Sequence, residues 1–391
     1  MKYNFDKVID RSGTSAEKVE GLKHIWGRTD LIPLWVADMD FATAPFVTDA
    51  IRKRCENEVL GYTGKPDSYY NAIINWVKQR YDLIVTKEVI NFVPGIVPGI
   101  GMAMNCFTQK GDKVKIQHPV YHPFAWVTTR NERTLVINPL RWENGMYRMD
   151  LDAFREQIKG CKLFILCNPH NPGGVVWTEA ELRAIADICY DEKVLVFSDE
   201  IHADLTLPPH THRPFATVSE KARMNSVTFM SPSKAFNMPV LSASHALIFN
   251  EDLRKRFRIY MDAGELDMGH VFAFLSVEAA YSHGTEWLDQ CLAYIQGNID
   301  FVDEFLKKHA PKIKAIRPEA SYLVWLDCRE LELSQKDLNE FFVDKAHLAL
   351  NDGEMFGKEG IGFMRLNVAS PRCIIEKAMK QLADAYQLYI K

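Results

Sequence analysis

Three polar groups that could do chemistry each follow a short apolar run in the middle of this sequence. Lys234 lies in "SPSKAF" after "SVTFM", Asp199 follows "VLVFS", and Asn171 lies in "NPHNPGG" after "KLFILC". Burial would depress the pKa of a lysine here and leave a nucleophilic amine. A carboxylate at the edge of a core needs a hydrogen-bonding or charged partner, because burying it alone is costly. The three sites together therefore predict a ligand pocket.

The chemistry of the three sites narrows the ligand class. They suit a molecule that is anionic at one end, has a basic nitrogen and offers an electrophilic carbon to an amine. Pyridoxal phosphate has all three features, since its aldehyde reacts with a lysine, its ring nitrogen pairs with a carboxylate and its phosphate accepts hydrogen bonds. Each segment alone could also be an ordinary turn, because N-P and G-G dipeptides are common in loops. The prediction therefore depends on the three segments together.

Alternation of apolar runs and helical patterns predicts how these residues are positioned. We expect strands at residues 112–117, 134–139, 162–167, 194–198, 226–230 and 245–249. Their continuous apolar character is typical of a mostly parallel sheet covered by helices on both faces. Thr178 and Glu181 form a T-x-x-E capping box that begins a helix between two of these strands. In such a sheet, ligands bind beyond the carboxyl ends of the strands, where the three polar segments lie.

The rest of the chain predicts a second, smaller α/β unit. After about residue 250 the pattern becomes helical, with further strands expected at 321–327 and 362–369. A chain of 391 residues is also longer than one average domain. We expect a large domain at residues 45–285 and a small domain formed by residues 1–44 and 286–391.

Composition excludes several functional classes. The net charge of −4 and the absence of long basic runs argue against nucleic-acid binding, and "LRKRFR" at 253–258 reads as a solvated helix face. No window approaches the about 18 apolar residues that span a membrane, and the polar N-terminus lacks an apolar signal core, so we expect a cytoplasmic protein. The eight cysteines have no metal-ligand spacing, so no metal site is expected. No G-x-G-x-x-G follows a strand, which argues against a nicotinamide enzyme.

An ordered set of motifs resembles the fold-type I pyridoxal phosphate enzymes of the class I/II aminotransferase superfamily. The set comprises "PGIVPGI", "HPVYHPF", "CNPHNPGG", "SDEIHADL", "SPSKAFN" and "MRLNVASPR" and covers residues 94–372. Two more motifs, "LIPLWVADMDF" and "GYTG", resemble the carbon-sulfur β-lyase branch of cystathionine β-lyase-like enzymes. The resemblance implies a seven-stranded, mostly parallel sheet between helices, with a smaller α/β domain.

By position, the resemblance also implies roles for individual residues. Lys234 matches the lysine that binds the cofactor covalently and moves the Cα proton, and Asp199 matches the partner of the ring nitrogen. Asn171 matches the residue that binds the ring O3′ oxygen, and Tyr121 matches the aromatic that stacks on the ring. Arg365 matches the arginine that grips the substrate α-carboxylate, a pairing that suits its planar fork of donors.

The remaining implied roles concern the phosphate and the second subunit. The phosphate would be bound by the residues Ile96, Val97, Ser231 and Ser233. Tyr62 matches a catalytic tyrosine that reaches the phosphate from the other subunit, which implies a homodimer with shared sites. His202, three residues after Asp199, is expected to support that aspartate or the ring.

One segment departs from the family. After the lysine the β-lyase branch usually carries a pattern of the type N-x-A-G-L-Q, and many aminotransferases carry G-x-R-x-G. This chain has "NMPVLSASH" at 237–245, without the glycine or the phosphate-binding arginine, and Pro239 removes a backbone donor. We expect this departure to alter the phosphate contacts or the floor of the pocket.

The resemblance favours α,β-elimination from L-cystathionine or a related cysteine S-conjugate, giving a thiol, pyruvate and ammonia. The first alternative is an aminotransferase, which uses the same residues and the same carbanion. A second alternative is a catalytically silent regulatory protein on this fold. Retention of Lys234, Asp199, Asn171 and Arg365 argues against the silent protein.

Overall fold

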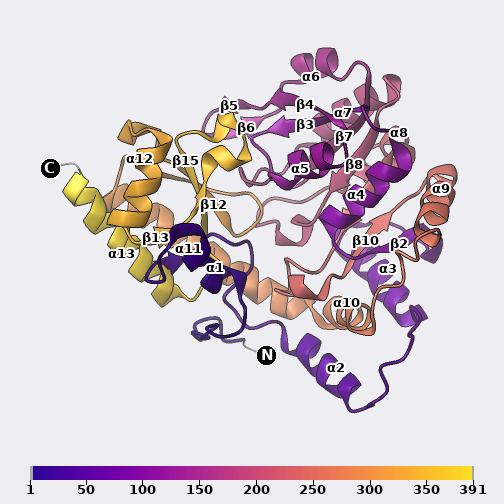
Figure 1. Cartoon of the computed structure of the whole chain (residues 1–391), viewed down its shortest axis with the longest axis horizontal. Coiled ribbons are helices and arrows are strands. Elements are labelled where there is room, and N and C mark those ends of the chain that lie inside the picture. Colours follow the sequence, from indigo (N-terminus) through magenta and orange to yellow (C-terminus); the bar gives the residue numbers. More distant parts are fainter. Residues whose placement is uncertain (1–2, 390–391) are drawn as a thin grey trace.

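Two lobes, each built around its own sheet, make up the protein (Figure 1). The computed structural model of the chain describes residues 3–389. A sheet of seven strands forms the centre of the larger lobe, and a sheet of four strands forms the centre of the smaller one. The N-terminal helix lies beside C-terminal elements in the smaller lobe, where Ile32–Pro33 pairs with Leu348–Ala349 (Figure 1).

The large sheet has the strand order β2-β10-β9-β8-β7-β3-β4. All its neighbouring pairs are parallel except those of β10, which is antiparallel to both neighbours. Its strands are β2 (Ile90–Val93), β3 (Lys113–His118), β4 (Thr134–Pro139), β7 (Cys161–Cys167), β8 (Leu195–Asp199), β9 (Ser226–Met230) and β10 (Ser244–Leu247).

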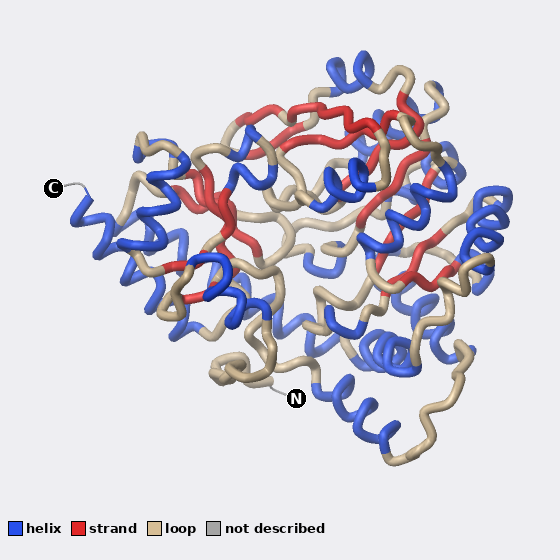
Figure 2. Tube along the Cα trace, viewed as in Figure 1, coloured by secondary structure: helices blue, strands red, loops and turns tan. Residues whose placement is uncertain are grey.

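Helices cover both faces of this sheet (Figure 2). Their bounds are α3 (Asp67–Tyr81), α4 (Ile96–Phe107), α5 (Pro123–Arg130), α6 (Leu151–Gln157), α7 (Glu179–Asp191), α8 (Glu220–Met224), α9 (Glu251–Asp262) and α10 (Val271–His283). Side chains of β7 alternate between two cores: Leu163 and Ile165 pack on one face, and Phe164 and Leu166 on the other. Burial on both faces explains why these strands read as continuous apolar runs.

The second sheet is antiparallel throughout, in the order β11-β12-β15-β14. Its strands are β11 (Lys314–Ile316), β12 (Leu323–Asp327), β14 (Asn351–Asp352) and β15 (Phe363–Asn367). The remaining helices are α1 (Glu17–Trp26), α2 (Pro45–Cys55), α11 (Thr285–His309), α12 (Gln335–Glu340) and α13 (Arg372–Tyr389). Two further pairs of short strands are present. β1 (Ile32–Pro33) pairs with β13 (Leu348–Ala349), and β5 (Arg141–Glu143) pairs with β6 (Met146–Arg148).

The predicted fold class is confirmed. Each strand expected from the sequence is present within a few residues, and the capping box is complete, since Thr178 Oγ1 accepts from the Glu181 amide and the Glu181 side chain accepts from the Thr178 amide. Strand β2 was not among the expected strands, although the resemblance implied a seventh. The domain boundaries stay a prediction; the one near residue 285 falls at the first residue of α11.

The backbone of residues 34–38, here named the strap, crosses from the N-terminal region to the second sheet. Its consecutive carbonyl groups all accept hydrogen bonds from residues in or next to β12 and β15. The donors are Asn367 N to Leu34 (2.9 Å), Arg365 to Trp35 (3.2 Å), Asn367 Nδ2 to Val36 (2.6 Å) and Asp38 (2.7 Å), and Tyr322 to Ala37 (2.9 Å). These hydrogen bonds therefore hold the strap against the second sheet along its whole length.

A buried charge cluster ties helix α1 to the end of the strap. The Lys18 ammonium lies 2.8 Å from Asp40 and 3.6 Å from Asp38, and its side chain is fully buried. The Arg11 guanidinium lies 2.6 Å from Asp38 and 3.1 Å from Asp40. A buried lysine is stable only with such partners, so this cluster fixes how α1 packs.

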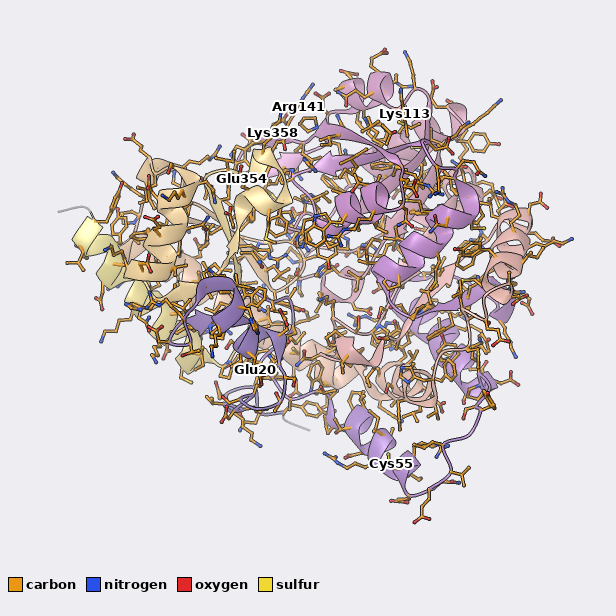
Figure 3. The ribbon with its side chains drawn as sticks, viewed as in Figure 1. Glu20, Cys55, Lys113, Arg141, Glu354 and Lys358 are labelled. Atoms are coloured by element: carbon orange, nitrogen blue, oxygen red, sulfur yellow. The ribbon has the colours of Figure 1, made fainter. Side chains whose placement is uncertain are left out.

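Five cysteines are buried, and exposed Cys55 lies at the periphery of the molecule (Figure 3). Within residues 3–389, no group of histidine, cysteine and acidic side chains could hold a metal ion. None of the described helices is both long and apolar enough to cross a membrane.

We expect Lys18→Met to lower the free energy of unfolding by about 2–3 kcal/mol, because it leaves two partly buried carboxylates with one cation. Urea unfolding followed by tryptophan fluorescence measures this, since Trp35 donates to the Lys18 carbonyl. Lys23→Met, at an exposed position of the same helix, is the control. Equal effects of the two substitutions would contradict the role given to the buried pair.

Candidate active site

A cavity of about 210 Å³ lies at the carboxyl ends of the central strands of the large sheet. It brings together several residues predicted from the sequence. Those in its wall are Ile96, Val97, Tyr121, Asn171, Asp199, His202, Ser233 and Lys234. The strands β7, β8 and β9 are neighbours, so segments far apart in the sequence end at one place.

The Lys234 amine has one neutral hydrogen-bond acceptor, the Ala37 carbonyl of the strap, at 2.6 Å. Burial and, to a smaller extent, the positive charge of Arg365 lower the pKa of Lys234 to about 8, against the opposing effect of Asp38 and Asp199. The amine is therefore partly unprotonated near neutral pH, which is the form that attacks a carbonyl carbon.

Asp199 and Glu200 are adjacent in sequence but face different surroundings. Glu200 accepts hydrogen bonds from Ser198, from His212 and from the Phe215 amide, each at 2.8 Å. Its carboxylate oxygens are therefore already bound by groups of the protein. Asp199 lies in the cavity wall and accepts from the Ile201 amide at 3.0 Å. Burial raises the pKa of Asp199 to about 7. A cationic ring nitrogen beside this carboxylate would favour its charged form.

Asn171 and Tyr121 are held together, because the Tyr121 amide donates to the Asn171 carbonyl at 3.0 Å. The Asn171 Oδ1 atom accepts from Arg365 at 3.1 Å. Its Nδ2 group is thus the part of the amide that can donate to an oxygen of a ligand. The Tyr121 ring lies in the wall of the same cavity, where it could cover the face of a flat ligand.

Arg365, on β15, is buried with neutral partners. Besides Asn171, it donates to the Trp35 carbonyl at 3.2 Å and to Asn351 Oδ1 at 2.5 Å, and its guanidinium stacks on the Phe356 ring at 4.8 Å. Burial lowers its pKa to about 10, so the group stays cationic at neutral pH. A buried cation whose described hydrogen bonds all go to neutral acceptors is suited to bind a carboxylate.

The opposite end of the cavity can bind an anion. Ile96 and Val97 begin helix α4, and the first N–H groups of a helix have no partner within it. Gly95 caps the helix with φ of 135°, a conformation that favours glycine. Ser233 lies in the wall, whereas Ser231 lies behind it, donates its one proton to the Ala243 carbonyl at 2.7 Å and accepts from Ser233 Oγ at 2.9 Å.

The segment that departs from the family forms part of the cavity wall. Pro239, Ser242, Ala243 and Ser244 all line it. Two serines of this segment, which lacks the arginine that the resemblance would imply, thus line the cavity. The expectation that this departure alters the phosphate contacts stays a prediction, and these serines are the candidates for the altered contacts.

His202 is buried in the cavity wall, and its Nδ1 atom has no hydrogen-bond partner among the described residues. Burial lowers its pKa to about 3, with a further lowering from Lys234 and Arg365. The imidazole is therefore neutral at physiological pH. It can hydrogen-bond a ligand without adding charge.

Tyr62 does not lie in the cavity of its own chain. Its side chain is 98% exposed, on the segment that joins α2 to α3. With residues 60–65 it borders a separate hollow of about 730 Å³, completed by residues 267–272. A role in catalysis would require another copy of the chain.

Sequence reasoning did not single out two neighbours of Lys234. The Ala37 carbonyl is a backbone group, so no side-chain pattern reports it. Tyr322 lies at the start of a predicted strand and reads as an ordinary core aromatic. Ala37 lies within the quoted motif "LIPLWVADMDF" and Tyr322 within the strand expected at 321–327, so only their roles were missed.

We expect the Lys234 amine of the cofactor-free protein to react with trace acetic anhydride in a pH-dependent way, with a midpoint near pH 8. Ordinary lysines, with a pKa of about 10.4, should become more reactive up to much higher pH. Mass spectrometry of peptides measures each lysine separately, with exposed Lys23 as the control. Arg365→Gln should move the Lys234 midpoint upward, and a midpoint equal to that of Lys23 would contradict the assignment.

Comparison with known proteins places this site in a family. Residues 29–382 match the family described as Aminotransferase class I and II. The chain is 37% identical to cystathionine beta-lyase PatB of Bacillus subtilis, over 98% of this chain and 99% of PatB. Cystalysin from Treponema denticola, solved with pyridoxal 5′-phosphate, superposes with a TM-score of 0.96 at 33% identity over all of both chains. The PLP-bound C-S lyase from Staphylococcus hominis superposes with a TM-score of 0.91 at 35% identity, covering 98% of each chain. The chain belongs to the class I and II aminotransferase family.

Proposed function

We propose that this protein is a pyridoxal phosphate-dependent carbon-sulfur β-lyase that cleaves L-cystathionine or a related cysteine S-conjugate. The observation that carries the proposal is the juxtaposition of Lys234 and Asp199 in the wall of one cavity, with Arg365 hydrogen-bonded to Asn171 of the same wall. The similarity to PatB and to C-S lyases along nearly the whole chain favours the lyase over other activities on this fold.

The residues present fit pyridoxal phosphate as the cofactor. Lys234 would bind its aldehyde carbon, Asp199 its ring nitrogen, and Asn171 its ring hydroxyl oxygen. The helix start at Ile96 and Val97, with Ser233, would bind the phosphate, and Ser231 would orient Ser233. Bound there, the cofactor would supply a ring that accepts the electrons left on the substrate Cα when its proton is removed.

Two residues of the chain, Arg365 and Lys234, would bind the substrate and remove its proton. Arg365 binds the substrate α-carboxylate and so fixes the amino acid in one orientation. The unprotonated Lys234 amine takes the Cα proton as a general base, and its lowered pKa suits this task near neutral pH. Loss of the thiolate from Cβ follows, and the remaining three-carbon fragment is hydrolysed to pyruvate and ammonia.

We expect the enzyme, supplied with pyridoxal phosphate and L-cystathionine but no keto acid, to produce pyruvate and ammonia through many turnovers. Lys234→Ala should lower the rate by more than about 10³-fold, because it removes the base and nucleophile. Pyruvate is followed by a coupled dehydrogenase, with Lys23→Met as the control. A single stoichiometric conversion that stops until keto acid is added would instead indicate an aminotransferase.

We also propose that the enzyme is a homodimer with shared sites. Tyr62 supports this, since it is almost fully exposed beside other exposed apolar residues, Val59, Leu60 and Met268. Such side chains gather on surfaces that meet a partner. In the dimer Tyr62 would reach the phosphate end of the partner's cavity. Location in the cytoplasm stays a prediction from the sequence.

Mixing two variants that are each expected to be inactive tests whether the two subunits share their active sites. If Tyr62 acts in the partner's site, a dimer of one Lys234→Ala chain and one Tyr62→Ala chain contains one intact site. Random exchange of subunits should then restore about a quarter of the wild-type activity. No recovery, with mixed dimers demonstrated by mass, would show that Tyr62 acts in its own chain, and full activity of Tyr62→Ala alone would show that Tyr62 has no role in catalysis.

A further inference from the structure

The Ala37 carbonyl oxygen receives two donors, one from the loop after β9 and one from the residue that precedes β12. Lys234 Nζ donates to it at 2.6 Å, and the Tyr322 hydroxyl donates at 2.9 Å. A carbonyl oxygen has two lone pairs, so these bonds can use its full capacity. The position of this one oxygen therefore governs where the free lysine amine lies.

The Tyr322 hydroxyl is suited to fix this oxygen and not to exchange protons. Its side chain is fully buried, and burial raises its pKa well above the ordinary tyrosine value. Its proton is directed at Ala37 in the hydrogen bond. Tyr322 also follows Ser321, whose φ of 82° is unusual for a residue other than glycine. The Ser321 amide donates to the Leu205 carbonyl at 2.9 Å, which helps to hold this conformation.

The neighbouring carbonyl groups link the same oxygen to substrate binding. Arg365, which would bind the substrate carboxylate, donates to the Trp35 carbonyl two residues away. Asn367 donates to the carbonyls of Val36 and Asp38, on either side of Ala37. The acceptor of the lysine and the arginine of the substrate site thus share one rigid piece of backbone.

We propose that Tyr322 is a positioning residue that holds the Ala37 carbonyl as the acceptor for the Lys234 amine whenever that amine is not joined to the cofactor. This rests on the proposed role of Lys234. The amine is free at two moments, before it captures the cofactor and after an incoming substrate amine has displaced it. At the second moment it must act on the Cα proton from a defined place, which a fixed acceptor provides.

Tyr322→Phe tests the proposal, because it removes only the hydroxyl. The variant keeps the ring in its buried site, and Ala37 keeps its bond to Lys234, so no buried acceptor is left unpaired. The matched control is Tyr389→Phe, whose hydroxyl also donates to a backbone carbonyl, that of Leu331 at 2.7 Å, on the C-terminal helix α13. Thermal unfolding of both variants verifies that they are folded.

Two rates are measured. The first is capture of pyridoxal phosphate by the cofactor-free protein, followed by absorbance, which requires no turnover. The second is exchange of the Cα proton of L-alanine with deuterated water in the holoenzyme, followed by NMR; L-alanine has no leaving group, so this isolates proton transfer. We expect both rates to fall about tenfold in Tyr322→Phe, the effect of one lost hydrogen bond, and to stay unchanged in Tyr389→Phe.

The outcomes separate this proposal from the proposed function. Borohydride treatment of the cofactor-loaded wild type should place the added mass on the Lys234 peptide. Mass on another residue would overturn the role of Lys234 and this inference with it. Mass on Lys234, with wild-type rates for both processes in folded Tyr322→Phe, would overturn the positioning role alone. A loss of substrate affinity at unchanged rates would assign Tyr322 to substrate binding and also contradict it.

Discussion

Burial of the Arg365 guanidinium is the constraint on which the arrangement of this protein depends. The group stands on the second sheet, yet its partners come from three places: Asn171 after a strand of the large sheet, Trp35 on the strap, and Asn351 on the adjacent strand. These three acceptors occupy the two terminal nitrogens of the guanidinium, whereas its Nε atom has no hydrogen-bond partner among the described residues. Without these acceptors the buried cation would be strongly destabilising. The two lobes and the N-terminal segment must therefore meet at this point for the cation to be stable.

The charge of Arg365 also acts at a distance. It contributes to the lowered pKa values of Lys234 and His202, so it keeps the amine reactive and the imidazole neutral. A bound carboxylate would offset this charge. If Arg365 binds the substrate carboxylate as proposed, recognition of the substrate and the protonation state of Lys234 would be coupled through electrostatics.

Sequence reasoning succeeded where side-chain type and strand order decide the outcome. Parallel strands bring their ends to one edge, so the sequence pattern is enough to place Lys234, Asp199 and Asn171 together, and the capping box at Thr178 follows from local chemistry. It failed where backbone groups or tertiary contacts decide. Strand β2 is four residues long and includes Asn91, so its pattern is weak, and nothing in the pattern around Ala37 indicates that its carbonyl faces a lysine. It also could not choose between Asp199 and Glu200 from burial alone, since both are buried.

The adjacent carboxylates Asp199 and Glu200 restrict where residues can be inserted into or deleted from this chain. Asp199 faces the cavity and Glu200 the interior of the protein, where Ser198 and His212 bind it. Side chains along a strand alternate between faces, so insertion or deletion of one residue within β8 would exchange the two. Asp199 would then face the interior and Glu200 the cavity. The hydrogen bonds that each carboxylate makes now would be lost together. Length variation in this protein should consequently be confined to its loops, while the length of β8 stays fixed even where its apolar residues are interchanged.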